Sequence, residues 1–469
     1  VENVQDTFNL TQRFAVATVY FATGGGENMW REEAHFLSGE HVCEWHAWAA
    51  EIIGIHDETA EKGVSCYGTN VVMMLNLAHN NLTGAIPEEI SLLPHLQAFV
   101  MSDNKIGGSI PGAVSSLDNL QLLLLGINQI EGTIPNNMSS SLVYLDLSVN
   151  ELIGPVPPLA NLTKLTALSL PFNYLTSTLP SLSDKPDLGL LWLSSNYFEG
   201  PLPPSVSNLT SLRQLAANDN SITGTVPFEA ELSLELLNLS RNRMNGTTDA
   251  AIDHLPNVSQ LGLSWNSLTG TLPDRMWELS NVETIDLNNN LLSGTLSPQV
   301  SNLNRTLLSF NIRVNFLNGT IPPSIVALKN LEAGLILSEN NFGGSIPEDI
   351  GNLEKVLTLS LWANNLSGSI PSSIGNMTNM NLLWLTMNAL TGTVPRSFAQ
   401  LTNLNFMSID RNALTGSIDF LCDLGMKLIE ADCLGGPENS SSLIECSCCS
   451  RCCNAAAGIC DPPYSSSGL

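Results

Sequence analysis

Residues 145–152 read Leu-Asp-Leu-Ser-Val-Asn-Glu-Leu, and residues 285–292 read Ile-Asp-Leu-Asn-Asn-Asn-Leu-Leu. The same pattern, with an asparagine at its sixth place, recurs along the chain at intervals of 22 to 25 residues. A fixed period of this length is typical of stacked repeats, each of which buries its apolar face against its neighbours. We call these residues the ladder asparagines: Asn80, Asn104, Asn128, Asn150, Asn173, Asn196, Asn220, Asn242, Asn266, Asn290, Asn315, Asn340, Asn364, Asn388 and Asn412.

Aligned on its ladder asparagine, each repeat reads LxxLxLxxNxLxGxIPxxIxxL, where x is any residue. The LxL part predicts a short strand with alternate side chains inward, so successive repeats build a parallel sheet. The ladder asparagine is expected to turn inward and pair with backbone groups that the tight turn leaves without partners. The sequence therefore predicts an α/β repeat solenoid.

The composition excludes some partners. The formal net charge is -26 with only 18 Lys+Arg, so the chain cannot neutralise a run of phosphates, and no nucleic-acid partner is expected. Attraction to an anionic membrane surface is disfavoured for the same reason. The apolar stretch at residues 14–22 is too short to span a bilayer, so no direct membrane insertion is expected. The chain starts at Val1 without a signal peptide, as expected of a processed form.

The ten cysteines lie only at the two ends of the chain. An even number confined to the ends of a solenoid predicts disulfide-stapled caps in an oxidising compartment, whereas the dense tail could also hold a metal ion. Eight tail cysteines allow 105 pairings, among which the sequence does not choose. The predicted disulfide residues are Cys43, Cys66, Cys422, Cys433, Cys446, Cys448, Cys449, Cys452, Cys453 and Cys460.

Thirteen Asn-x-Ser/Thr sequons agree with an extracellular location, although a chain this rich in Asn, Ser and Thr produces many of them by chance. The glycosylation candidates are Asn9, Asn81, Asn137, Asn161, Asn208, Asn238, Asn245, Asn257, Asn304, Asn318, Asn365, Asn376 and Asn439.

The LxGxIP segment resembles the plant-type leucine-rich-repeat family, and the resemblance covers residues 71–418. It implies a right-handed superhelical arc with a parallel concave sheet and a second short strand in each repeat. Residues 1–70 resemble the family's N-terminal cap, with an amphipathic helix from Asp6 to about Ala22, then Trp30 and the pair Cys43 and Cys66. Residues 419–469 form the predicted C-terminal cap, which resembles the cysteine-rich end of secreted or receptor-like leucine-rich-repeat proteins from diatoms.

No motif for catalysis is present. The sequence has no His-Glu-x-x-His, Gly-x-Ser-x-Gly or Walker segment, and no pair of carboxylates is marked out by its spacing. His41 and His46 flank Cys43, where a metal cluster and ordinary polar cap residues are both conceivable. The chain is therefore predicted to be non-enzymatic, with no cofactor and no metal.

Large apolar side chains recur at positions predicted to point outward from the concave strands, two, four or six residues before a ladder asparagine, or in the adjoining turn. Solvent-facing apolar clusters of this kind commonly mark binding sites, although some of these residues could instead fold down against neighbouring repeats. Arg241, Arg243 and Arg313 lie between the early and late groups and could receive an acidic group. The predicted ligand-binding residues are Leu124, Tyr144, Phe172, Tyr174, Trp192, Tyr197, Trp362 and Trp384.

A row of hydroxyl residues follows the turn of the later repeats. Regular hydroxyls at strand spacing could bind an ordered lattice such as ice, whereas the plant-type repeat ordinarily places Thr or Ser there to pair across a second strand. The row comprises Thr225, Thr247, Thr271, Thr295, Thr320, Ser345, Ser369, Thr393 and Ser417.

Two main functional hypotheses follow from the sequence. The first is an extracellular recognition module, secreted or part of a cell-surface receptor, that binds a protein, peptide or glycan on its concave face. The alternative is a structural or adhesive matrix protein that associates with copies of itself. Ice binding through the hydroxyl row is a minor alternative.

Overall fold

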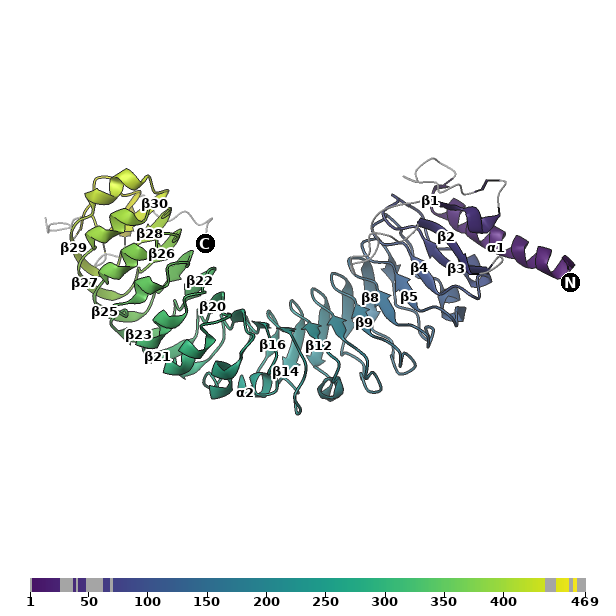
Figure 1. Ribbon diagram of the computed structural model, residues 1–469, viewed down its shortest axis with the longest axis horizontal. Helices are drawn as coiled ribbons and strands as arrows, with labels where there is room; N and C mark the ends of the chain where they lie inside the picture. The colour runs from purple at the N-terminus through teal and green to yellow at the C-terminus, as the bar shows by residue number, and fades with distance from the viewer. Residues whose placement is uncertain are drawn as a thin grey trace. The chain divides into compact units, whose positions relative to one another are not determined.

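The computed structural model describes residues 2–25, 37–38, 41–47, 62–67, 71–434, 444–454 and 459–461. The chain divides into two compact units, Val1–Ser233 and Leu234–Leu469, which we call unit 1 and unit 2. In each unit the repeats contribute one strand apiece to a main parallel sheet (Figure 1). The predicted parallel β-sheet solenoid is confirmed. Trp30 and the sequon at Asn439 lie outside the described residues, as does the side chain of His46.

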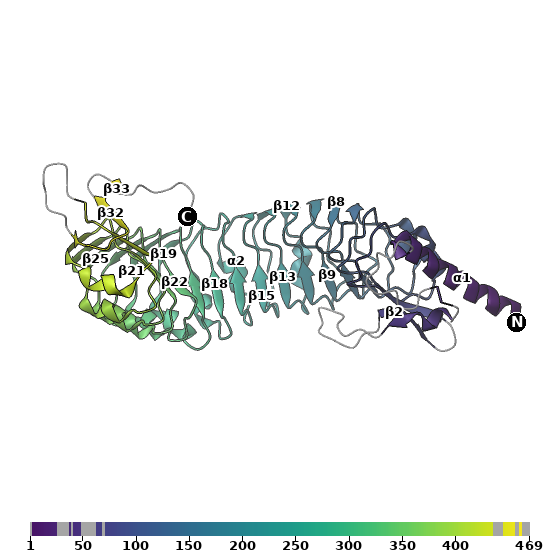
Figure 2. The same cartoon turned by 90° about the horizontal axis from the view of Figure 1, so that it is seen from above.

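Unit 1 begins with a cap. Its elements are α1 (Glu2–Ala22), η2 (Val42–Glu44), β1 (His46–Ala47) and β2 (Lys62–Tyr67), and the Cys43–Cys66 disulfide joins η2 to β2. The helix starts four residues before the predicted Asp6. Gln12 in α1 accepts a hydrogen bond at 2.8 Å from the backbone nitrogen of Val72, so the helix covers the start of the first repeat strand. Figures 1 and 2 show α1 at the N-terminal end of unit 1.

The repeats of unit 1 carry a main strand before each ladder asparagine and a second strand after most of them. In some repeats a short helical turn leads to the next main strand. The main strands are β3 (Val71–Asn76), β4 (Ala98–Val100), β5 (Leu122–Leu124), β7 (Tyr144–Asp146), β9 (Ala167–Ser169), β11 (Leu190–Trp192) and β13 (Gln214–Ala216). The second strands are β6 (Glu131–Gly132), β8 (Glu151–Pro155), β10 (Tyr174–Ser177), β12 (Tyr197–Pro201) and β14 (Ser221–Gly224), and the turns are η3 (Glu88–Leu92), η4 (Gly112–Ser116) and η5 (Pro204–Asn208).

Unit 2 repeats the same plan and ends in an antiparallel pair, β32 and β33 (Figure 2). Its main strands are β15 (Leu236–Asn238), β17 (Gln260–Gly262), β18 (Thr284–Asp286), β20 (Ser309–Asn311), β22 (Gly334–Ile336), β24 (Thr358–Ser360), β26 (Leu382–Trp384), β28 (Phe406–Ser408), β30 (Leu428–Ala431) and β32 (Arg451–Asn454), followed by β33 (Ile459–Asp461). The second strands are β16 (Arg243–Met244), β19 (Ser293–Thr295), β21 (Phe316–Thr320), β23 (Asn341–Gly344), β25 (Asn365–Ser369), β27 (Ala389–Thr393), β29 (Ala413–Ser417) and β31 (Ile444–Glu445). The helical segments are α2 (Asp249–Ile252), η6 (Asp274–Glu278), η7 (Pro298–Leu303), η8 (Pro323–Ala327), η9 (Ile350–Asn352), η10 (Ser372–Asn376), η11 (Arg396–Gln400) and η12 (Asp419–Leu424).

The ladder asparagines turn inward, as predicted, and bind backbone groups of their own repeat and of the preceding one. Asn290 is representative: its Oδ1 accepts from the backbone nitrogen of Leu268 in the preceding repeat at 3.0 Å. Its Nδ2 donates to the carbonyl of Leu263 at 3.0 Å, and also to those of Leu287 and Asn288. Because burial of an unpaired backbone group is costly, this one side chain stabilises both the turn of its own repeat and the contact with its neighbour.

The residue before each ladder asparagine adopts a left-handed conformation, with φ between 52° and 58°. Only a few residue types favour this region, yet the position is occupied by Ile127, Phe172, Met387 and Arg411, among others. The turn therefore fixes the backbone whatever the side chain, and it presents these side chains at the edge of the main sheet.

Among the described helices, none combines the length and apolar character that a bilayer crossing requires.

Candidate ligand-binding surfaces

Trp362 and Trp384 lie on the outward face of the main sheet in unit 2. Trp384 is the last residue of β26 and lies in register between Ser360 of β24 and Ser408 of β28. Its neighbours Leu383 and Leu385 point inward and are fully buried, whereas Trp384 itself is half-buried. The period-two alternation of the strand thus presents the indole ring outward, as the sequence predicted.

The two tryptophans line one pocket of about 480 Å³. Its other lining residues are small hydroxyl residues of the strands, apolar side chains and two arginines: Arg313, Ile336, Thr358, Ser360, Thr386, Met387, Ser408 and Arg411, with Glu430 beside them. A mostly apolar pocket of this size with a few polar groups is typical of a ligand site.

Neighbouring groups fix both arginines of the pocket. Arg313 pairs with Glu339 at 2.6 Å between Nη2 and Oε1, and its guanidinium lies 5.0 Å from the ring centre of Trp362. Arg411 lies 3.7 Å from the carboxylate of Asp410 and donates to the sulfur of Met387. A guanidinium held by one carboxylate keeps further N–H groups for a second acceptor. The pocket therefore suits a ligand with an apolar group and an adjacent hydrogen-bond acceptor.

Arg313 was singled out from the sequence, but Arg411 and Met387 were missed. Both occupy the left-handed position immediately before a ladder asparagine. The repeat pattern already places this position in the turn beside the predicted binding surface, so the sequence could have marked both residues as candidates. A repeat pattern gives the backbone position of such a residue, but not the direction in which a long side chain extends.

The structure corrects the facing of Leu124 in unit 1. This residue was expected to face solvent, yet it is only 5% exposed and packs with Ala78 and Val100. Leu122 and Tyr144 cover the same cluster. Burial, and then the nearby carboxylate of Asp146, raises the pKa of Tyr144. Val100 is the register partner of Leu124 in the preceding repeat, and Leu122 and Tyr144 are register partners of each other, so these apolar side chains pack together instead of standing in water.

The remaining predicted residues of unit 1 separate into two places. Trp192 lies on β11, half-buried, and its indole nitrogen donates to Gln214 Oε1 at 3.2 Å. Phe172, Tyr174 and Tyr197 lie beside the ladder asparagines instead, where the main strand gives way to the second strand. These three side chains are 60%, 49% and 59% exposed and line a second pocket of about 390 Å³.

Several residues of the hydroxyl row lie on second strands of unit 2, where Ser369, Thr393 and Ser417 are exposed. Asn318 and Asn365, two of the predicted glycosylation residues, are exposed on the same series of strands. A glycan at either residue would cover part of the row.

All ten cysteines form disulfides: Cys43–Cys66, Cys422–Cys448, Cys433–Cys452, Cys446–Cys449 and Cys453–Cys460. The sulfurs of Cys453 and Cys460 lie within 4.8 Å of a carboxylate oxygen of Asp410, but they are bonded to each other and do not form a thiolate metal site. At the other end of the chain, His41 Nδ1 accepts from the backbone nitrogen of Cys43, which is the role of an ordinary cap residue.

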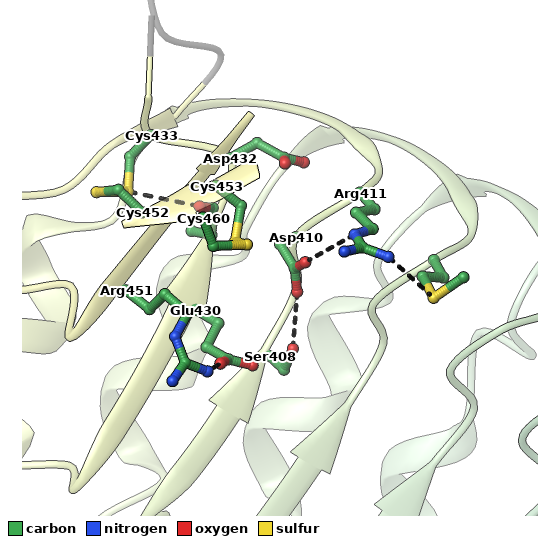
Figure 3. The surroundings of a disulfide bond; sticks show 12 residues. Ser408, Asp410, Arg411, Glu430, Asp432, Cys433, Arg451, Cys452, Cys453 and Cys460 are labelled. Carbon is green, nitrogen blue, oxygen red and sulfur yellow. Dashed lines mark hydrogen bonds and ion pairs between the residues drawn. A yellow bond between two sulfur atoms is a disulfide. The ribbon is translucent and has the colours of Figure 1, made fainter. Parts of the chain in front are cut away.

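Two carboxylates are buried where the repeats meet the C-terminal cap: Asp410 of the last repeat and Asp432 of the cap (Figure 3). Ser408 donates to Asp410 at 2.8 Å, and the backbone nitrogen of Asn412 donates to Asp432 at 3.0 Å. One oxygen of each carboxylate is buried without a hydrogen bond. Burial raises the pKa of Asp432 above 3.8, and the Asp410 carboxylate raises it further, against the hydrogen bonds from the backbone.

We expect this pKa to make the cap more stable in acid. A carboxyl whose pKa is higher in the folded state favours folding when protonated, and that contribution is lost as the pH rises from 3.8 through the raised folded-state pKa. Asp432→Asn should therefore raise the denaturant midpoint at neutral pH, and the difference from the parent should shrink as the pH falls. Asp423→Asn, an exposed residue of the same cap, is the control. A pH-independent difference between parent and Asp432→Asn would contradict this account.

Comparison with known proteins agrees with this geometry. A family model described as Leucine Rich Repeat matches residues 72–93, 187–209, 281–303, 334–353 and 355–377. The chain folds as a leucine-rich-repeat solenoid. The comparison with curated proteins found no match.

Solved leucine-rich-repeat structures resemble the chain over most of its length. One is a TDR receptor, with 27% identity and a TM-score of 0.68 over 74% of this chain and 61% of that one. A second is the plant peptide hormone receptor RGFR1 in complex with RGF2, with 25% identity and a TM-score of 0.63 over 80% of this chain and 78% of that one. A third is the ectodomain of the plant membrane receptor kinase GASSHO1/SCHENGEN3 from Arabidopsis thaliana, in complex with CASPARIAN STRIP INTEGRITY FACTOR 2, with 27% identity and a TM-score of 0.52 over 82% of this chain and 57% of that one. These similarities support a plant-type leucine-rich-repeat family.

Proposed function

We propose that the protein is an extracellular, non-enzymatic recognition module that binds a peptide ligand on the outward face of the main sheet in unit 2. The observation that carries this proposal is the pocket of Trp362 and Trp384, which presents two indole rings between Arg313 and Arg411. Tryptophan and arginine are the residues that most often dominate the binding energy of protein interfaces. The half-buried indole rings leave apolar surface in water, and apolar surface patches commonly mark binding sites.

Two further observations support the proposal. The similar plant peptide hormone receptor RGFR1 was solved in complex with RGF2. Five disulfides support an extracellular location, because such bonds persist in oxidising compartments. The resemblance of the tail to diatom proteins stays a prediction.

Selection of a displayed peptide library on the immobilised protein tests the proposal. Peptides with a large apolar side chain next to a carboxylate are expected to be enriched, because the pocket offers indole faces and guanidinium donors. Enrichment that is independent of an acidic group and of an apolar side chain would contradict it.

Self-association is the alternative function, and the exposed apolar residues Phe172, Tyr174 and Tyr197 are the observation that favours it. The net charge of -26 opposes it, because two copies repel each other. We expect the purified protein to sediment as a monomer at physiological salt over a hundredfold range of concentration. A mass that rises with concentration would favour the matrix role over recognition.

A further inference from the structure

We propose that the edge of unit 1 formed by Phe172, Tyr174, Tyr197 and Asp219 binds an alkylated ammonium group. These residues come from three consecutive turns and line one pocket of about 390 Å³. The site shares no residue with the pocket in unit 2, and it would remain if the peptide proposal failed.

Two of the three aromatic rings form a stacked pair, and the third belongs to Phe172, which lines the same pocket. The rings of Tyr174 and Tyr197 are nearly parallel, at 15°, and their centres are 6.2 Å apart. Phe172 precedes its ladder asparagine in the left-handed position, whereas each tyrosine directly follows one. All three residues are largely exposed, so part of each side chain is accessible to a ligand.

The polar atoms of the pocket favour a cation over an anion. The amide nitrogens of Asn173 and Asn196 donate to backbone carbonyls and are not available to a ligand. Among the described residues that line the pocket, none is a lysine or an arginine. Asp219 contributes a negative charge, and the faces of aromatic rings carry negative potential.

The surface around the pocket is negatively charged, like Asp219 within it. Glu151 and Glu199 are exposed on β8 and β12, the strands on either side of β10 in the second sheet. The chain as a whole carries a net charge of -26. A field of this sign raises the local concentration of cations and speeds their association. It also repels a second copy of this chain, which would bring the same charges to the contact.

The walls of the pocket select an organic cation over a metal ion. Calcium takes six to eight oxygen ligands and magnesium requires a near-ideal octahedron of oxygens. One carboxylate among three aromatic rings does not supply such a set. A cation with an apolar envelope suits both the apolar rings and the negative charge of the pocket. Its methyl groups contact the rings, and its charge is attracted to the ring faces and to Asp219. A free alkylammonium compound and a methylated lysine side chain of another protein share this chemistry.

Choline and its neutral isostere 3,3-dimethyl-1-butanol test the proposal on the full chain, by calorimetry and ligand-observed NMR. Choline is expected to bind about tenfold or more tightly than the isostere, because the two differ only in charge. Equal binding of the two probes, or saturable binding of neither, would overturn the proposal. A peptide with one trimethyl-lysine distinguishes the two sources, with the same peptide carrying glutamine at that position as its control. Tighter binding of the trimethyl-lysine peptide than of choline points to a protein side chain, and equal binding points to the free compound.

Substitutions locate the site. Tyr174→Leu and Tyr197→Leu should each weaken choline binding about three- to tenfold, whereas Tyr197→Phe should retain it, because only the latter keeps the ring. Asp219→Asn should also weaken it. Phe316→Leu is the matched control, since Phe316 is an exposed ring at the same repeat position in unit 2. Loss of choline binding in Phe316→Leu, or full retention in Tyr174→Leu with an unchanged unfolding midpoint, would contradict the assignment.

Discussion

Replacing Asn290 with alanine is expected to lower the free energy of unfolding by about 3 kcal/mol or more. The substitution removes the acceptor for the backbone nitrogen of Leu268 and the donor to the carbonyls of Leu263, Leu287 and Asn288. Each backbone group left buried without a partner costs about 1–3 kcal/mol, and alanine leaves too little space for an orderly set of replacement waters. Because Asn290 links two repeats, the loss destabilises the contact between them as well as the turn.

Chemical denaturation followed by circular dichroism measures this effect. Asn341→Ala is the matched control, because Asn341 is an exposed asparagine on β23 in the same unit. Exposed substitutions of this kind change the stability by within about 0.5 kcal/mol. If the two variants had equal midpoints, the ladder asparagines would not have the structural role assigned to them.

Replacing Trp384 with alanine is expected to weaken binding of a selected peptide by about 30-fold, the effect of losing a central interface residue worth about 2 kcal/mol. The indole ring supplies apolar surface to the pocket, and its register partners Ser360 and Ser408 are too small to replace it. The unfolding midpoint should change little by comparison, because the ring is half-buried while the neighbouring leucines, which hold the strand in place, remain.

Trp265→Ala is the control for this substitution. Trp265 is an exposed tryptophan of unit 2 that lies under the guanidinium of Arg241 and does not line the pocket. It should leave the affinity unchanged. Equal losses of peptide affinity in Trp384→Ala and Trp265→Ala would show that the peptide binds tryptophan nonspecifically. The pocket would then not be the ligand site.

The repeat pattern predicted the backbone better than the surface. The spacing of the ladder asparagines fixed their direction, because an amide at that position has backbone partners in every repeat. The exposure of side chains on the outward face of the sheet was less predictable. Leu124 and Trp384 both lie four residues before a ladder asparagine, yet only Leu124 is buried. The difference lies in the adjacent repeats, where Val100 and Tyr144 pack on Leu124 and smaller Ser360 and Ser408 flank Trp384.

The cap chemistry was accessible from the sequence only in part. Confinement of the cysteines to the ends predicted disulfides, but not their pairing, which depends on the antiparallel contact of β32 and β33 for Cys453 and Cys460. The sequence does not predict the burial of the Asp410 and Asp432 carboxylates, since acidic residues are ordinarily exposed. Their burial follows from the register of β28, β30 and β32, which places them in adjacent layers.

The most direct test of the recognition role is site-specific photocrosslinking of a selected peptide. Two residues of one repeat provide the comparison: Thr386 lines the pocket, and Thr391 is exposed on β27 in the second sheet. A photoreactive residue at position 386 is expected to capture the peptide, and the same residue at position 391 is not. Capture from position 391 with none from position 386 would contradict the assignment of the pocket as the ligand site.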